Sequence, residues 1–96
     1  MLKADLHIHT SCSKDGESTV AQVIAAAVTA GMDVIAITDH DTMDGYRIAC
    51  EISADILIIP GVEVSTREGH LIALGVEKAP LPEFPIFDTI QEVRQA

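Results

Sequence analysis

The stretch VIAITDHDT, residues 34–42, places an uninterrupted apolar run directly before a cluster of polar side chains. Residues 34–38 have the length of a strand and are apolar at consecutive positions, so both faces of this strand must be covered. Strands of this kind are typical of parallel sheets with helices packed against them. The stretch therefore predicts a central strand of an α/β fold, with Asp39, His40 and Asp41 placed at its carboxyl end.

A second strand is predicted near the start of the chain, over residues 4–9. Asp5, His7 and His9 are expected to face one side of it, since successive side chains of a strand alternate between its two faces. Histidine has no packing advantage in an apolar stretch. A lone pair of this kind is nevertheless more often exposed or hydrogen-bonded than bound to a metal ion.

Apolar residues at helical spacing predict one helix before the central strand in the sequence and another after it. The first begins at Val20, with Ser18 as its N-cap and Gly31 as its stop. The second runs from about Met43 to Ser53 and is capped by Thr42.

The pattern changes after these two helices. Residues 56–59 predict a third strand, ended by the Pro60-Gly61 pair. Residues 62–65 and 70–74 flank a polar turn at 66–69 and predict a hairpin. The expected order is βαβαβ followed by a β-hairpin.

The last part of the chain predicts one more helix. Asp88 and Thr89 can both cap it, and Thr89 with Glu92 forms a capping-box pattern. The chain ends at Ala96, about two turns later. We expect residues 1–96 to be a single domain that is truncated after its first half.

Composition excludes several classes of protein. The 15 acidic residues against 6 basic ones give a formal charge of −9, which argues against an electrostatic grip on duplex nucleic acid. The 2 cysteines show no metal-binding or disulfide spacing. No segment approaches the roughly 18 apolar residues of a membrane span. We therefore expect a cytoplasmic protein without membrane contact.

Residues that suit metal binding fall at the predicted strand ends and the loops that follow them. Each has an ordinary reading alone, because a turn, a helix cap or an exposed strand position can carry a histidine or an acid. Their gathering at one rim favours a metal site instead, since imidazole and carboxylate bind zinc, iron or manganese. The histidines are His7, His9, His40 and His70, and the carboxylates are Asp15, Asp39, Asp41 and Glu63.

The motifs DLHIHT...SKDG, AITDHDT..G, IPGVEVS and GHLIALG resemble, in order and spacing, those of the PHP (polymerase and histidinol phosphatase) domain family. The resemblance extends from Asp5 to Gly75. It implies the N-terminal portion of a distorted (β/α)7 barrel with a trinuclear metal centre and phosphoesterase activity. The motif style is most similar to that of small stand-alone members acting on nucleotides, such as nucleoside bisphosphate phosphatases and short-RNA exonucleases.

The same resemblance implies a role for each matching residue. His7 and His9 would bind one metal ion with help from a bridging Glu63, and Asp15 and His40 would bind another. His70 would serve the third site. The residues expected to act in catalysis are Asp15, His40 and Glu63. Two or three Zn, Mn or Fe ions are expected, although the further histidine and Asp-x-His ligands of the family do not follow His70 here.

Two functions follow from this interpretation. The first is hydrolysis of a phosphorylated small molecule, nucleotide or short oligonucleotide by a metal-bound hydroxide. The second is a non-catalytic PHP-type module that binds metal or has a structural role.

Asp39 and Asp41 are expected to orient His40 and its loop rather than to bind metal. An open half-barrel is also expected to associate with itself, because it exposes strand edges and apolar surface.

Overall fold

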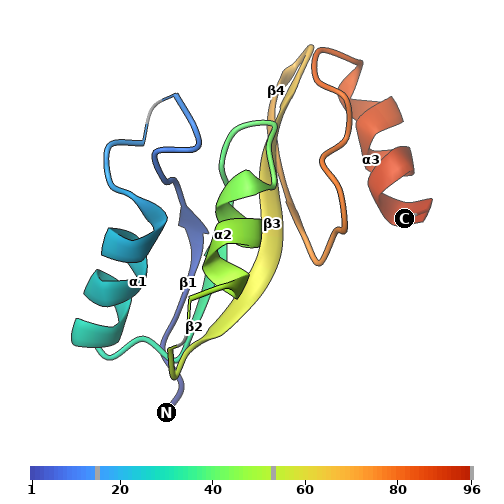
Figure 1. Ribbon diagram of the computed structural model, residues 1–96. Helices are drawn as coiled ribbons and strands as arrows, with labels where there is room; N and C mark the ends of the chain where they lie inside the picture. Colours follow the sequence, from blue (N-terminus) through green and yellow to red (C-terminus); the bar gives the residue numbers. More distant parts are fainter. Residues whose placement is uncertain (15, 53, 96) are drawn as a thin grey trace.

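The computed structural model describes residues 1–14, 16–52 and 54–95. Across these residues one four-stranded sheet forms, in the order β1-β2-β3-β4 (Figure 1). The first three strands are parallel, and β4 is antiparallel to β3. The predicted βαβαβ order followed by a hairpin is confirmed. The elements are β1 (Ala4–Ile8), α1 (Val20–Thr29), β2 (Val34–Ile37), α2 (Asp44–Cys50), β3 (Leu57–Thr66), β4 (Gly69–Leu74) and α3 (Ile86–Gln95).

Strand β3 changes partner in its middle. Its first half pairs with β2, ending at Ile37 opposite Pro60, and its second half pairs with β4, starting at Gly61 opposite Leu74. The prediction that Pro60-Gly61 ends the strand is wrong. Pro60 has no N–H to donate, but its carbonyl accepts the N–H of Gly75 at 2.7 Å, so proline is tolerated at this changeover. The strand therefore continues beyond the end of β2.

Helix α1 begins at Val20 as predicted, but its N-cap is one residue later than expected and forms a capping box. Thr19, rather than Ser18, is the N-cap: its hydroxyl accepts the Gln22 N–H at 3.2 Å, and the Gln22 side chain accepts the Thr19 N–H at 2.9 Å. This reciprocal pair satisfies two N–H groups at the start of the helix, which Ser18 cannot do from its position. Gly31 follows the helix with a φ of 78°, as expected of a stop signal.

Helix α2 is shorter than the predicted 43–53. It begins at Asp44, whose N–H is accepted by the Thr42 hydroxyl at 3.1 Å, and it ends at Cys50. The N–H groups of Glu51 and Ile52 donate to carbonyls three residues back, at 3.1 and 3.0 Å. This tightening into a 3₁₀-type turn ends the α-helix. Ser53, the predicted end, lies outside the described residues.

Helix α3, unlike the other two helices, begins earlier than predicted. The Pro85 carbonyl accepts the Thr89 N–H at 3.2 Å, so Thr89 lies within the first turn and the predicted Thr89–Glu92 capping box does not form. A carboxylate from the hairpin turn caps the helix instead, because Glu68 Oε1 accepts the Ile86 N–H at 2.7 Å. A negative charge at this end is favoured by the helix dipole. None of the helices among the described residues is long and apolar enough to cross a membrane.

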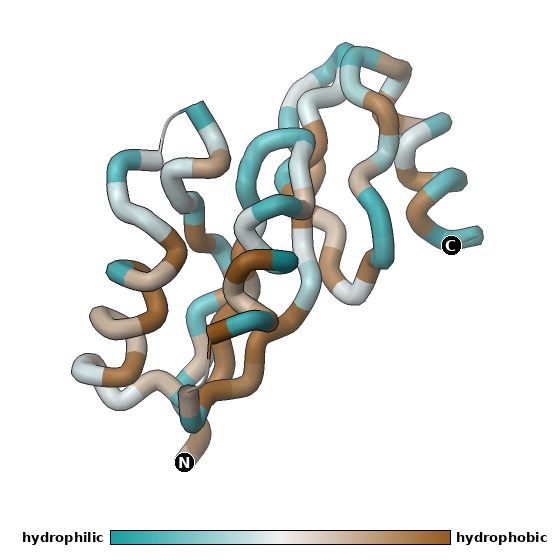
Figure 2. Tube along the Cα trace, viewed as in Figure 1, coloured by the Kyte–Doolittle hydropathy of each residue, from teal (hydrophilic) through white to brown (hydrophobic). Residues whose placement is uncertain are grey.

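The core consists of two apolar clusters that pack helices against the sheet. Figure 2 shows the hydrophobic residues gathered where β2 and the first half of β3 run side by side. One cluster lies between α1, β2 and α2, and the other lies on the face of the β3–β4 hairpin that packs against side chains of α2 and α3. The first contains Val20, Ile24, Ala27, Ile35, Ile37 and Ala49, and the second contains Met43, Val62, Val64, Ala73 and Val76.

Candidate metal centre

The four histidines gather around Glu63 at the carboxyl ends of the parallel strands. Val62 and Val64 are buried in the core, so the alternation of side chains along β3 turns Glu63 to the opposite face. The backbone continues the sheet here, because the N–H of Glu63 donates to the Asp39 carbonyl at 3.0 Å. The extension of β3 past Pro60 thus places Glu63 beside the loops that follow β1 and β2.

Each carboxylate oxygen of Glu63 faces a different pair of imidazoles. Oε1 lies 2.6 Å from His7 Nε2 and 2.9 Å from His9 Nε2. Oε2 lies 3.1 Å from His70 Nδ1 and 3.9 Å from His40 Nδ1. The rings also follow one another in space, with centroids 5.1 Å apart for His7 and His9, 4.6 Å for His9 and His40, and 5.0 Å for His40 and His70. Glu63 is therefore the centre of the cluster.

Among the residues that the structure describes, two groups of potential metal ligands share this glutamate. One comprises His7, His9 and Glu63, and the other comprises His40, Glu63 and His70. Within each group the ligand atoms all lie within 4.8 Å of one another. Ligands held about 2.0–2.1 Å from one tetrahedral zinc ion lie about 3.3 Å apart, so both groups fit a small divalent cation after modest side-chain rotation. The donor set, imidazole plus carboxylate, suits Zn, Mn and Fe alike.

The cluster is closed on its inner side and open on its outer side. The Glu63 side chain is 8% exposed, and those of His40 and His9 are 13% and 23% exposed. His7 and His70, by contrast, are more than half exposed. Solvent or a ligand can therefore reach the cluster past the two outer rings.

The charge of Glu63 is stabilised by its neighbours. Burial by itself raises the pKa of this carboxyl, but the hydrogen bonds with His7 and His9 and the charge of His40 outweigh burial and hold the pKa below its ordinary value. Glu63 is therefore a carboxylate at neutral pH, which is the form that binds a metal ion.

Asp5 does not share the side of β1 that carries the histidines, contrary to the prediction. The pairing register shifts between Asp5 and Ile8, and this irregularity places both residues in the same groove against α1. Asp5 instead accepts the His7 N–H at 3.2 Å. A bulge adds a residue to one strand, which reverses the side on which the residues before it lie.

The predicted site residues thus fall into three groups. The structure brings together His7, His9, His40, His70 and Glu63, and it places His70 in one group with His40. Asp15 lies outside the described residues. Asp39 and Asp41 point elsewhere: Asp39 accepts hydrogen bonds from Thr10, and Asp41 accepts the Ser65 N–H at 2.8 Å.

Sequence reasoning missed two residues that connect these loops. Thr10 is fully buried beneath the cluster, and the Ser13 hydroxyl accepts the His40 N–H at 3.0 Å. Thr10 follows the His-x-His pair directly and Ser13 lies three residues further on, but small polar residues in a loop resemble ordinary turn residues, and their partners lie far away in sequence. Only the position of Thr10 next to His9 could have suggested a role.

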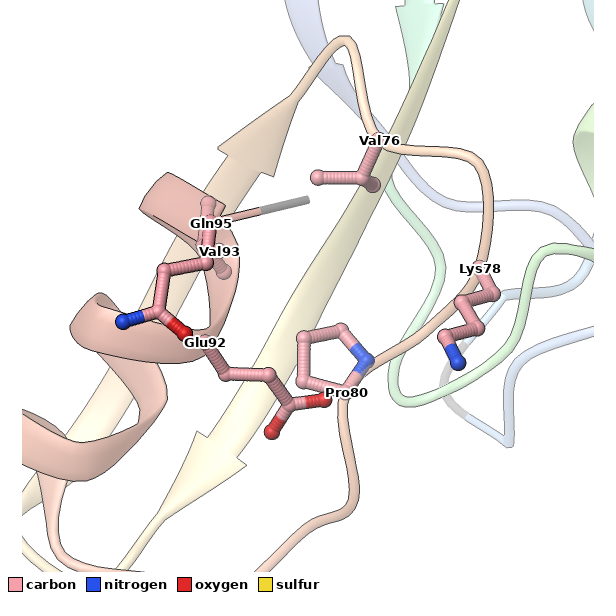
Figure 3. Close-up of a pocket in the computed structure, with 6 residues that line it drawn as sticks. All are labelled: Val76, Lys78, Pro80, Glu92, Val93 and Gln95. Atoms are coloured by element: carbon pink, nitrogen blue, oxygen red, sulfur yellow. The ribbon is translucent and has the colours of Figure 1, made fainter.

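A separate groove lies between residues 76–80 and α3, with a volume of about 260 Å³ (Figure 3). Within the described part of the chain, its lining offers one carboxylate and no imidazole. It is therefore a poor candidate for metal chemistry. The lining residues are Val76, Lys78, Pro80, Glu92, Val93 and Gln95.

A family model described as PHP domain matches residues 5–84. The chain belongs to the PHP domain family. The family membership inferred from the motifs is therefore confirmed, and so is the expected partial (β/α) barrel. A solved structure of an amidohydrolase from Chromobacterium violaceum, with bound sulfate and no metal, superposes with a TM-score of 0.72 at 36% identity. The superposition covers 81% of this chain and 29% of that one.

Three curated relatives are named as enzymes that cleave phosphate esters. A phosphoribosyl 1,2-cyclic phosphate 1,2-diphosphodiesterase of Eggerthella lenta is 37% identical over 77% of this chain and 31% of its own length. A 5'-3' exoribonuclease of Haemophilus influenzae is 40% identical over 79% of this chain and 30% of its own. A 3',5'-nucleoside bisphosphate phosphatase of Chromobacterium violaceum is 36% identical over 82% and 30%. This PHP chain thus spans about a third of each relative.

Proposed function

We propose that this PHP chain contributes the first part of a metal-dependent phosphoesterase site. The observation that carries the proposal is the position of Glu63, with one carboxylate oxygen toward His7 and His9 and the other toward His40 and His70. A carboxylate placed in this way can bridge two divalent ions. The names of the relatives support the reaction class, since all three act on phosphate esters.

The residues would divide the metal ions between them according to their geometry. His7 and His9 would hold one ion and His40 and His70 another, with Glu63 shared. Asp15 remains a proposed ligand and catalytic residue, together with His40 and Glu63. Bound divalent ions would activate water and offset the charge that develops on the phosphoryl oxygens.

This chain's own residues would prepare the site for that chemistry. Glu63 supplies a charged ligand at neutral pH, because its neighbours hold its pKa low. The partly buried positions of His9 and His40 limit their motion, whereas the exposed rings of His7 and His70 border the open side. A phosphate group would enter from that side. Bound cations would also reduce the formal charge of −9 that otherwise repels an anion.

The proposed substrates are phosphorylated small molecules, nucleotides or short oligonucleotides, and the proposed metals are Zn, Mn or Fe, two or three per site. We propose a cytoplasmic location as well. The names of the relatives support nucleotide-like substrates, because one acts on nucleoside bisphosphates and another on RNA.

Elemental analysis of the 96-residue chain, purified without chelators, tests the metal site. We expect about two transition-metal ions per chain, and we expect Glu63→Gln to lose them because both ligand groups share that carboxylate. Glu77→Gln is the matched control, since it removes the same charge from an exposed position outside the cluster. Metal retained equally by all three proteins would contradict the assignment of Glu63.

Release of phosphate from a nucleotide panel, with added Mn²⁺ or Zn²⁺, tests the activity. The alternative function is a metal-binding or structural module, to which the two ligand groups around Glu63 would also be suited. Metal binding without phosphate release, in this chain and in a longer parent protein, would support that alternative and refute the phosphoesterase.

A further inference from the structure

We infer that Thr10 and Asp39 form a buried clamp that positions the metal ligands of all three parallel strands. This inference rests on the proposed metal centre and assigns positioning residues to it. The two side chains are fully buried, and they join the loop after β1 to the loop after β2. They lie in sequence beside ligands, Thr10 next to His9 and Asp39 next to His40.

Both carboxylate oxygens of Asp39 are held by the same threonine. The Thr10 N–H donates to Oδ1 at 2.5 Å, and the Thr10 hydroxyl donates to Oδ2 at 2.7 Å. Two hydrogen bonds to one charged acceptor fix both its position and its orientation. Because Thr10 is bonded through its main chain, the clamp sets the backbone path directly after His9.

The main chain around Asp39 carries this order to the other ligands. The Asp39 carbonyl accepts the Glu63 N–H at 3.0 Å, which ties the clamp to the central carboxylate. On the β1 side, Ser13 donates its N–H to the Thr10 carbonyl at 3.0 Å and accepts the His40 N–H at 3.0 Å with its hydroxyl. The clamp therefore connects the backbones of His9, His40 and Glu63 through one continuous network.

Helix α2 packs closely against the side chains of Asp39 and Thr10. A Cβ atom at Gly45 would lie 2.3 Å from Asp39 Oδ2 and 3.0 Å from Thr10 Oγ1. Only glycine lets the helix backbone approach the carboxylate so closely. Water is thereby kept from the two hydrogen bonds, which strengthens them and makes the loss of either partner costly.

A matched pair of substitutions separates the clamp from simple packing. Thr10→Val keeps the shape but removes the hydroxyl that donates to Asp39, whereas Thr10→Ser keeps the hydroxyl. Titration of the 96-residue chain with Co²⁺, followed by its absorption spectrum, reports both affinity and coordination geometry. We expect Thr10→Val to lower the affinity about 10- to 100-fold and to change the spectrum, as loss of a supporting hydrogen bond does at metal sites. We expect Thr10→Ser to remain within a few fold of the unchanged chain.

A second control distinguishes positioning from general loss of stability. Ile24→Val removes a methylene from the core of α1, away from the cluster, and is expected to lower stability without changing Co²⁺ affinity. If Ile24→Val and Thr10→Val weaken binding equally, or if Thr10→Val binds as the unchanged chain does, the clamp has no positioning role. If Thr10→Val does not fold, Asp39→Asn replaces it, since the amide keeps an acceptor for the Thr10 N–H, and the same direction of change is expected.

An NMR measurement on the metal-free chain separates failure of the clamp from failure of the metal centre. We expect the backbone N–H signal of Glu63 and the ring signals of His9 and His40 to shift in Thr10→Val and to stay unchanged in Ile24→Val. Unchanged signals in Thr10→Val would overturn the clamp whether or not Co²⁺ binds. Shifted signals in a chain that does not bind Co²⁺ would support the clamp and refute the metal centre.

Discussion

Substitution of Gly45 by alanine tests how closely α2 packs on the buried carboxylate. The new methyl carbon would lie 2.3 Å from Asp39 Oδ2 and 3.0 Å from both Ile37 Cγ2 and Thr10 Oγ1. Ordinary carbon–oxygen contacts are about 1 Å longer than the first of these distances. Asp39 is held by two hydrogen bonds from Thr10 and cannot turn away without breaking one. Either the helix or the carboxylate must move.

The expected loss of stability follows from these contacts. Alanine in a helix is favoured over glycine by about 1 kcal/mol. Against this, overpacking costs about 1–3 kcal/mol, or displacement of the carboxylate loses a charged hydrogen bond worth about 1.5–3 kcal/mol. These are two ways of accommodating one methyl group, so only one is counted. After the gain in helix propensity is subtracted, the net destabilisation is at most about 2 kcal/mol and is centred near about 1 kcal/mol, which corresponds to a fall in Tm of roughly 4–8 °C for a domain of this size.

Thermal unfolding followed by circular dichroism measures this fall on the metal-free chain. Gly31→Ala is the control, because a Cβ there meets no atom within 4 Å, although the φ of 78° makes alanine unfavourable. The control should lose stability without any change in Co²⁺ affinity, whereas Gly45→Ala should lose both. A Gly45→Ala chain as stable as the original, or more stable, would refute the packing argument.

Three further predictions concern other parts of the molecule. Folding lowers the pKa of Glu63, so the stability that this carboxylate contributes is present above its ordinary pKa and is lost as the pH falls through the lowered one. Urea unfolding of the metal-free chain from about pH 6 to about pH 3 should therefore show a steeper loss of unfolding free energy than in Glu63→Gln. Parallel profiles of the two proteins would contradict the assignment. Glu68→Ala should destabilise α3 by about 1 kcal/mol, since the Glu68 carboxylate accepts the Ile86 N–H at the start of the helix, whereas Glu68→Gln should retain most of the stability. Hydrogen exchange of the α3 amides measures the difference, and equal exchange rates in the two variants would rule out the cap. The chain should self-associate, because its exposed surface of 5894 Å² exceeds the roughly 5300 Å² expected of a folded 10.2 kDa monomer. Sedimentation velocity at rising protein concentration tests for self-association, and a single monomeric species at every concentration would refute the prediction.

The local pattern of the sequence determined the order of the elements and the residue types of the site. The apolar run at 34–37 and the helical spacing after Val20 are short-range patterns, and the folded protein has a strand and a helix at these positions. His7 and His9 were found because imidazoles in an apolar strand lack a packing reason, and His40 and His70 because they fall at the same predicted strand ends and following loops. The boundaries were less accurate, since Thr19 and Glu68 took over the caps expected of Ser18 and Thr89. Which of several polar residues caps a helix depends on where the preceding chain lies.

Tertiary structure alone decided how the site is arranged. The continuation of β3 through Pro60 carries Glu63 between four histidines, and this requires partners on both β2 and β4 that no local pattern reveals. The bulge in β1 turns Asp5 away from the cluster, because a single shift of register changes the face on which a side chain lies. The bond between Thr10 and Asp39 spans 29 residues. Contacts of this kind depend on the register between strands distant in sequence, whereas periodicity describes only neighbours along the chain.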